Sequence, residues 1–341
     1  MTAPQELIDR MGTDGLRLWV ASIETQGDVV VSQTLLTNVQ ESYRKMRNTC
    51  RFLLQNMYDF DAEKDAVSFE KLSVIDQYAL HELYLFNERV IKNYRQRSLT
   101  GVYHAFVDYC TVELSSFYLD IIKDRLYTDK ADGLERRSAQ TVCWEMLQTL
   151  TPLMAPILSF TAEQISDCYQ KNKKESIHLQ NITSVKNIWN ESERKKNEEQ
   201  WSMMRMVRSL VLKAIEGLRK KELVKHSLEA KVTLIMKAKT ESTALIKDFF
   251  ATVNASKNQT SNQFLKEFCI VSACDVVEDD EFQYEDENGQ MVCVTDESRG
   301  LQVKASHAPG SKCPRCWQWE ITDNQQGLCA RCQKVVADFV P

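Results

Sequence analysis

Apolar residues recur at helical spacing over long stretches of the first half of the chain. Apolar residues recur at helical intervals over residues 32–56, and at alternating steps of three and four over residues 103–126; a further long helix, with a possible N-cap near Ser73, is expected over about 68–98. This spacing places them on one face of a helix, which then packs against a neighbour. In the first segment the stripe is Leu36, Val39, Tyr43, Met46, Cys50, Leu53 and Leu54. The pattern predicts three long helices that each bury one face.

A fourth helix is predicted over residues 135–150, after the break at Asp132-Gly133. Pro152 and Pro156 are expected to interrupt it, because proline lacks the N–H that continues a helix. A short helix should begin near Thr161. Short connections between helices are typical of an antiparallel bundle, which we expect to extend over residues 31–170.

The pattern changes after the predicted bundle. Residues 171–200 are polar and rich in charge, which favours a linker that is helical at most in part. Helical spacing returns over residues 201–221 and 240–251, and short apolar runs predict strands at 232–236, 268–271, 291–294 and 301–305. Residues 201–306 are therefore expected to form a small α+β domain. The predicted class is mainly α: an antiparallel helical bundle, then this α+β domain, then a four-cysteine knuckle.

Four cysteines near the C-terminus have the spacing of a tetrahedral zinc site. Cys313 and Cys316 form one Cys-x2-Cys pair, and Cys329 and Cys332 form a second pair after a gap of twelve residues. Four thiolates fill a tetrahedral coordination shell, so we expect one structural Zn²⁺ that folds residues 307–341 and no catalytic metal. The alternatives are disulfides, or buried cysteines that share this spacing by chance.

Composition limits the other classes of function. Of the 341 residues 43% are hydrophobic, enough for a normal core, and only ten glycines and six prolines occur, as in proteins built from long helices. Seven further cysteines are scattered singly, a usage typical of a reducing compartment. We find no signal-peptide pattern at the N-terminus and no run of eighteen apolar residues, so a cytoplasmic protein without a membrane span is expected.

The formal net charge of −5 does not by itself indicate a nucleic-acid partner, but the charge is unevenly distributed. Residues 203–225 hold seven Lys or Arg against two acids, whereas residues 275–297 hold ten acids and no Lys or Arg. One surface can therefore attract phosphate groups while another repels them.

Several long segments resemble one family closely. They are APQELIDRMGTDGLRLWVAS (3–22), SYRKMRNTCRFLLQNMYDFD (42–61), RRSAQTVCWEMLQTLTPLMAPILSFTAEQI (136–165), HSLEAKVTL (226–234), and GSKCPRCW with LCARC (310–332). Together they resemble the C-terminal portion of bacterial-type isoleucyl-tRNA synthetase, a class I enzyme. The Lys-Cys-x-Arg-Cys-Trp tail separates this family from its valyl and leucyl relatives.

The resemblance implies a division of labour. Residues 1–30 look like the connection that follows a catalytic domain, residues 31–170 like the anticodon-binding bundle, and residues 201–306 with the zinc tail like the region that closes over the anticodon stem-loop. The family's His-Ile-Gly-His and Lys-Met-Ser-Lys-Ser motifs, which use ATP and Mg²⁺ in the catalytic half, do not occur in this sequence. The segment by itself is therefore not expected to activate isoleucine.

Three functions remain in competition at this point. The first is the tRNA(Ile)-binding half of an isoleucine–tRNA ligase, which joins isoleucine to tRNA with ATP and whose other partner is the enzyme's catalytic half. The second is a free-standing RNA-binding zinc protein derived from that half. The third is a structural zinc protein whose bundle binds another protein. A monomer is expected.

Granted the family, certain basic and aromatic residues are expected to contact tRNA. Unpaired bases stack on aromatic rings, and arginine and lysine neutralise phosphates. For Trp319 the alternative is that the indole packs beneath the zinc site as core. The expected contacts are Arg44, Arg47, Arg51, Arg205, Arg208, Lys213, Arg315, Trp317, Trp319 and Arg331.

Two departures from the family pattern stand out. Val224-Lys225-His226 replaces a glycine-containing turn before Ser-Leu-Glu-Ala, so bulkier residues must make that turn. The acidic run from Glu278 to Glu287 matches no family feature, and a solvated loop is its expected structure.

Overall fold

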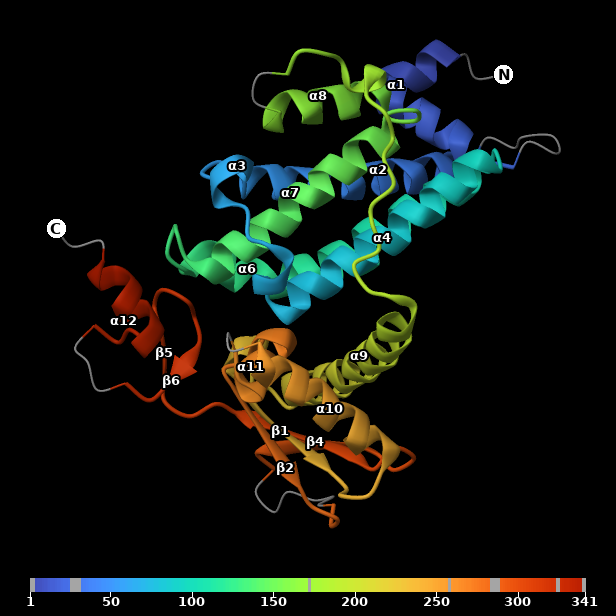
Figure 1. Cartoon of the computed structure of the whole chain (residues 1–341). Helices are drawn as coiled ribbons and strands as arrows, with labels where there is room; N and C mark the ends of the chain where they lie inside the picture. Colours follow the sequence, from blue (N-terminus) through green and yellow to red (C-terminus); the bar gives the residue numbers. More distant parts are fainter. Residues whose placement is uncertain are drawn as a thin grey trace. The chain divides into compact units, whose positions relative to one another are not determined.

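The computed structural model describes residues 4–24, 32–170, 173–256, 259–282, 289–322 and 326–338 (Figure 1). The chain divides into two compact units. The first comprises residues 1–126 and 131–188, and the second comprises residues 127–130 and 189–341. The predicted class, a helical bundle followed by a smaller unit with a sheet and a cysteine cluster, is confirmed.

The first unit is built from helices. They are α1 (Pro4–Ala21), α2 (Gln33–Gln55), α3 (Ala62–Asp65), η1 (Phe69–Lys71), α4 (Val74–Arg95), α5 (Leu99–Asp108), η2 (Tyr109–Tyr118), α6 (Leu119–Thr128), α7 (Leu134–Met154), α8 (Ser159–Tyr169) and η3 (Ile177–Leu179). The stripe predicted on α2 is largely buried: Leu36, Val39, Met46, Cys50 and Leu53 all face the core. Ser32 begins this helix by accepting a hydrogen bond from the backbone N–H of Leu35 at 3.2 Å.

The helix predicted over residues 103–126 is present, but its middle, Tyr109–Tyr118, is a π-helix rather than an α-helix. In this segment the carbonyl oxygen of Cys110 accepts from two side-chain hydroxyls, those of Ser115 at 2.7 Å and Thr49 at 3.4 Å. Cys110, Leu114 and Phe117 remain buried, because the apolar stripe still meets the core. Apolar spacing alone does not distinguish these two helix types.

Two predicted boundaries were also wrong. Helix α7 continues through Pro152 to Met154, so the proline lies in the last turn rather than ending the helix. Helix α9 (Glu191–Lys220) begins ten residues before the predicted Trp201. Its start is fixed by a capping box, in which the Asn190 side chain and the Glu193 side chain each accept from the other's backbone N–H.

A buried ion pair ties the helices of the first unit together. Asp76 on α4 is 0% exposed, and Arg125 on α6 approaches its two carboxylate oxygens at 2.9 and 3.0 Å. The hydroxyls of Tyr118 and Ser138 also donate to this carboxylate, the former at 2.8 Å. The charge of Asp76 is thus fully paired inside the apolar core.

The second unit combines helices with a four-stranded sheet. Its elements are α9, η4 (Ser227–Glu229), β1 (Ala230–Met236), α10 (Glu241–Ala255), α11 (Ser261–Cys269), β2 (Ala273–Glu278), β3 (Met291–Asp296), β4 (Leu301–His307), β5 (Ser311–Lys312), β6 (Trp319–Glu320) and α12 (Ala330–Ala337). The strand order is β2-β1-β4-β3, parallel between β1 and β2 and antiparallel elsewhere. Helix α9 packs against β3 and β4, and α11 packs against β2.

The strand predicted at residues 268–271 is wrong. Phe268 and Cys269 end α11, and Ile270 adopts the left-handed conformation (φ 56°) that terminates it. The apolar run straddles a helix end, where Phe264, Leu265, Phe268 and Cys269 form the buried face. The strand that pairs with β1 starts later, at Ala273.

The departures from the family pattern have different outcomes. Glu222 makes the turn after α9 in a left-handed conformation (φ 57°), while Val224 is buried and the Lys225 backbone N–H donates to Glu229 at 2.7 Å. Of the acidic run Glu278–Glu287, residues 283–287 lie outside the described residues. Among the residues that are described, no helix has the length and apolar character needed to cross a membrane.

Candidate metal centre and nucleic-acid interface

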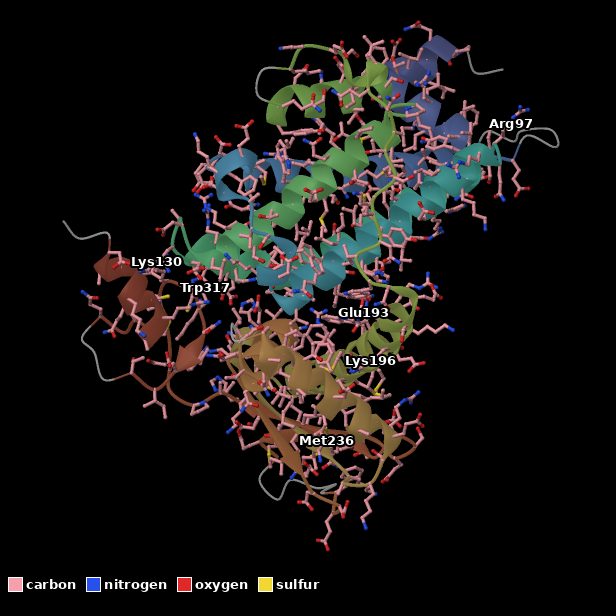
Figure 2. All side chains as sticks on the ribbon, in the orientation of Figure 1. Arg97, Lys130, Glu193, Lys196, Met236 and Trp317 are labelled. Atoms are coloured by element: carbon pink, nitrogen blue, oxygen red, sulfur yellow. The ribbon has the colours of Figure 1, made fainter. Side chains whose placement is uncertain are left out.

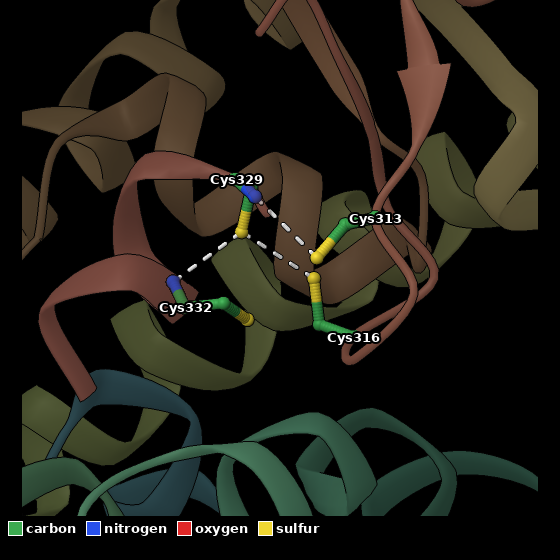
Figure 3. A group of neighbouring side chains, drawn as sticks. All are labelled: Cys313, Cys316, Cys329 and Cys332. Atoms are coloured by element: carbon green, nitrogen blue, oxygen red, sulfur yellow. Dashed lines mark hydrogen bonds between the residues drawn. The ribbon is translucent and has the colours of Figure 1, made fainter. Parts of the chain in front are cut away.

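The four predicted cysteines converge at one buried point (Figure 3). Their sulfur atoms all lie within 4.8 Å of one another, and Sγ of Cys316 and Cys329 are 3.5 Å apart. A tetrahedral zinc with Zn–S bonds of about 2.3 Å requires sulfurs about 3.8 Å apart, so a small adjustment would fit the ion. The donor set is four sulfurs, which suits a soft or borderline metal and leaves no position for water.

Short local elements bring the two cysteine pairs together. Cys313 follows β5 directly, and Cys329 caps the N-terminus of α12, where its sulfur accepts from the backbone N–H of Cys332 at 3.4 Å. Gly310 (φ 91°) comes directly before β5 and lies against the end of β6, where a Cβ would be 2.3 Å from the backbone of Glu320. Glycine is therefore required at this position.

Backbone N–H groups stabilise the thiolate form of one cysteine of the site. Burial alone raises the pKa of the Cys313 thiol, but the N–H groups of Cys316, Cys329 and Arg315 point at its sulfur and lower the pKa to about 6. Burial raises the pKa of Cys316 well above its usual range. A bound cation would replace the proton that the Cys316 thiol otherwise retains.

Arg315 and Arg331 occupy equivalent places in the two knuckles and contact the same residue, Thr128, which ends α6 and clusters with the second unit. Arg315 donates to the backbone carbonyl of Thr128, and its Nη1 lies 3.6 Å from Sγ of Cys332. Arg331 donates to the Thr128 hydroxyl at 3.0 Å. Both side chains, predicted from sequence as tRNA contacts, are thus engaged within the protein.

The two tryptophans beside the second ligand differ in environment. Trp317 is 60% exposed in a left-handed conformation (φ 66°), and it projects from the knuckle (Figure 2). Trp319 is half-buried on β6, with its ring 4.6 Å from that of His307 and its indole N–H buried without an acceptor among the described residues. The ring of Trp319 thus packs against His307 of β4, and Trp319 is not part of the apolar cluster around the four cysteines.

The predicted basic residues of α9 point in different directions. Lys213 is exposed and Arg205 is half-buried. Arg208 is 7% exposed, its Nε donates to the carbonyl of Phe268 at 2.8 Å, and its guanidinium lies 5.8 Å from the centre of the Phe268 ring. Arg208 therefore joins α9 to α11 from inside the fold.

The predicted basic residues of α2 share one side of that helix. Arg44, Arg47 and Arg51 are exposed and separated by three and four positions. Arg44 pairs with Glu41 at 2.6 Å, and both of those side chains remain exposed. An exposed pair of this kind exchanges readily for another anion.

Sequence reasoning missed Lys312. Its ammonium lies 4.8 Å from the centre of the Trp317 ring, so it covers part of that ring with a positive charge. The signal was available in the sequence, because a lysine directly before the first ligand and a tryptophan directly after the second are brought together by the knuckle.

Comparison with known protein families gives a match over the middle of the chain. Residues 76–234 match the family described as the anticodon-binding domain of tRNA ligase. The match covers α4 to α8 of the bundle and continues into β1 of the second unit.

Relatives along the whole chain are more specific. The isoleucine–tRNA ligase of Geobacter sulfurreducens is 37% identical over 340 residues, and that of Carboxydothermus hydrogenoformans is 39% identical over 341 residues. Each alignment covers 98% of this chain and 34% of the relative. The predicted resemblance to the C-terminal portion of isoleucine–tRNA ligases is confirmed, and the chain spans about a third of the length of these relatives.

A solved structure was also compared. The ternary complex of Agrobacterium radiobacter K84 agnB2 LeuRS with tRNA and LeuAMS aligns with 75% of this chain and 27% of that chain, at 13% identity and a TM-score of 0.32. This similarity is too low to support a conclusion.

Proposed function

We propose that this chain is the tRNA-binding, anticodon-recognising part of an isoleucine–tRNA ligase, whose complete form joins isoleucine to tRNA(Ile) with ATP. The observation that carries the proposal is the similarity to isoleucine–tRNA ligases over 98% of the chain, together with the anticodon-binding match at residues 76–234. The catalytic remainder of such an enzyme is its second partner. A location in the cytoplasm is consistent with eleven cysteines that form no disulfide, and a monomer is proposed beside it.

We propose zinc as the metal of the four-cysteine site. The sulfurs of Cys313, Cys316, Cys329 and Cys332 would hold it, and a closed sulfur shell suits an ion that folds the segment rather than one that reacts. Zinc would supply rigidity to the knuckle that carries Trp317.

Within each unit, the exposed members of the predicted set are the proposed contacts to tRNA. In the first unit these are Arg44, Arg47 and Arg51 on α2, which would neutralise phosphates. In the second unit they are Lys213 on α9 and Trp317, with Lys312 beside the indole ring. A base stacked on the exposed ring of Trp317 would contribute about 1–3 kcal/mol.

Binding of tRNA(Ile) at increasing salt tests the proposal. We expect the zinc-loaded chain to bind tRNA(Ile) more tightly than a tRNA with another anticodon, with an affinity that falls as salt rises. Trp317→Ala should weaken binding about 5- to 150-fold, the equivalent of 1–3 kcal/mol, with zinc content unchanged. Trp319→Ala removes the other tryptophan of this segment and is the matched control. Because that ring is half-buried, its loss should lower the stability of the tail. Equal affinity for all tRNAs would contradict anticodon recognition.

The ligase assignment has a separate test. An antibody raised against this segment should detect a native gene product far larger than 39.4 kDa in cell extract. A band at 39.4 kDa would instead support the free-standing RNA-binding protein.

A further inference from the structure

The two cysteine knuckles repeat one local pattern with an arginine at the same place. The first reads Cys313-Pro-Arg315-Cys316 and the second reads Cys329-Ala-Arg331-Cys332. Both arginines reach Thr128, the last residue of α6, which is 8% exposed. Arg315 donates to the carbonyl oxygen of Thr128 and Arg331 donates to its hydroxyl, so both arginines contact a single residue.

Arg315 also faces the metal site. Its Nη1 lies 3.6 Å from Sγ of Cys332, within reach of an N–H···S hydrogen bond. Four thiolates around one Zn²⁺ carry a net double negative charge, and a buried charge of this size requires compensation. A guanidinium with several fixed donors can serve a sulfur and a carbonyl at the same time.

The acceptor at Thr128 is suited to a cation. The last carbonyls of a helix have no partner within the helix, and its C-terminus attracts positive charge. Lys130 forms an ion pair with Asp338 after α12, so a third contact joins the same short segment to the tail. Residues 127–130 belong to the same compact unit as the tail.

We propose that Arg315 and Arg331 form a latch that couples metal loading of the four-cysteine site to the seating of the tail on residues 127–130. Arg315 is the positioning residue that joins the two ends, because it touches both the ligand sulfur of Cys332 and the carbonyl of Thr128. Arg331 supplies the second arm to the hydroxyl. The inference rests on the proposed zinc site.

The charge-compensating arm is tested by metal retention. Zinc release to a chelator and the absorption spectrum of the Co²⁺-loaded chain are measured for wild type, Arg315→Gln and Lys312→Gln. Lys312→Gln removes an equal charge that neighbours Cys313 but lies over the Trp317 ring. We expect release 10- to 100-fold faster and a shifted thiolate-to-cobalt band for Arg315→Gln only. Equal effects in both variants, or none in either, would overturn the proposal.

The second arm is tested by hydrogen exchange in a peptide that covers residues 127–130. In wild type we expect faster exchange after zinc removal. Thr128→Val, which removes the hydroxyl and keeps the carbonyl, should raise exchange there with zinc retained. Exchange that is insensitive to zinc in wild type would overturn the coupling.

Two further readouts distinguish failure of the arginine latch from failure of the proposed zinc site. A wild-type chain that binds no zinc contradicts the proposed metal site itself, whereas a zinc-loaded chain with unchanged release in Arg315→Gln contradicts only the latch. A tRNA salt slope lowered by Arg315→Gln with normal zinc release would make Arg315 a phosphate contact instead.

Discussion

The helical unit and the cysteine tail, residues 307–341, are held together by different forces. The helical unit buries long apolar stripes from α2, α4 and α7, and even its internal charge, Asp76, is fully paired. Among the described residues of the tail, the four cysteines, Leu328 and the partly buried Val336 form a small apolar cluster. So few apolar atoms offset little of the entropy of ordering the segment, and we therefore expect its fold to depend on the proposed zinc. The two regions should therefore fail under different conditions.

Loss of the metal should produce the largest effect and should be confined to the tail. Cys313→Ser removes one of four ligands from a site of a type worth about 10–16 kcal/mol to folding, so zinc should be lost and the tail should unfold. Metal analysis and proteolysis of the tail measure this, with the thermal transition of the helical unit unchanged. Cys168→Ser, at an exposed cysteine of α8, is the control and should retain zinc. A Cys313→Ser chain with full zinc content would show that the site is not the four-cysteine cluster.

Loss of the buried ion pair should instead destabilise the helical unit and leave the tail folded. Asp76→Ala leaves the guanidinium of Arg125 buried without its carboxylate and should destabilise the unit by about 3–5 kcal/mol in urea unfolding. Zinc content should not change. Asp120→Ala removes an exposed ion pair with Lys123 and should cost at most about 1 kcal/mol. A similar loss of unfolding free energy in both variants would mean that the buried ion pair contributes no more than the exposed one.

Acid should also weaken the helical unit through a defined group. Burial alone would raise the pKa of Asp59, but hydrogen bonds from Arg136 and Gln140 outweigh it and lower the pKa below its ordinary value. A lowered folded-state pKa stabilises the protein above about pH 4, and this contribution is lost as the pH falls through the lowered value.

Asp59→Asn should therefore cost about 1.5–3 kcal/mol at pH 7, because it replaces a charged acceptor that Arg136 holds at 2.6 and 2.9 Å. Urea unfolding at pH 7, 4 and 3 should show the difference from wild type narrowing as the pH falls. Asp108→Asn, at an exposed pair with Arg89, is the control. A difference that is constant with pH would exclude Asp59 as the titrating group.

The same two regions show what the sequence could predict. The helices and the four-cysteine cluster were predictable because periodic apolar stripes and ligand spacing are local signals, as α2 and Cys313 to Cys332 show. The π-helix at Tyr109–Tyr118 and the helix end at Ile270 were not, because they depend on which distant groups meet the backbone. The carbonyl of Cys110, for example, is satisfied in part by Thr49 on another helix.

The interface residues divide in the same way. Sequence indicates where basic and aromatic residues occur, but not whether the fold needs them. Arg208 has the same charge and helical setting as Lys213, yet packing against Phe268 uses it internally. Trp317 and Trp319 are two positions apart, and only the left-handed turn at Trp317 turns that ring outward.

The smallest expected effect distinguishes a phosphate contact from an ordinary exposed charge. Arg47→Ala on α2 should leave the stability of the helical unit unchanged, because the side chain is exposed. If Arg47 neutralises one phosphate of bound tRNA, the slope of log affinity against log salt should fall by about 0.7–0.9. Lys123→Ala, at an exposed base already paired with Asp120, is the matched control and should leave the slope unchanged. An unchanged slope in Arg47→Ala would remove this face of α2 from the proposed interface, because Arg44 and Arg51 share the same side of the helix.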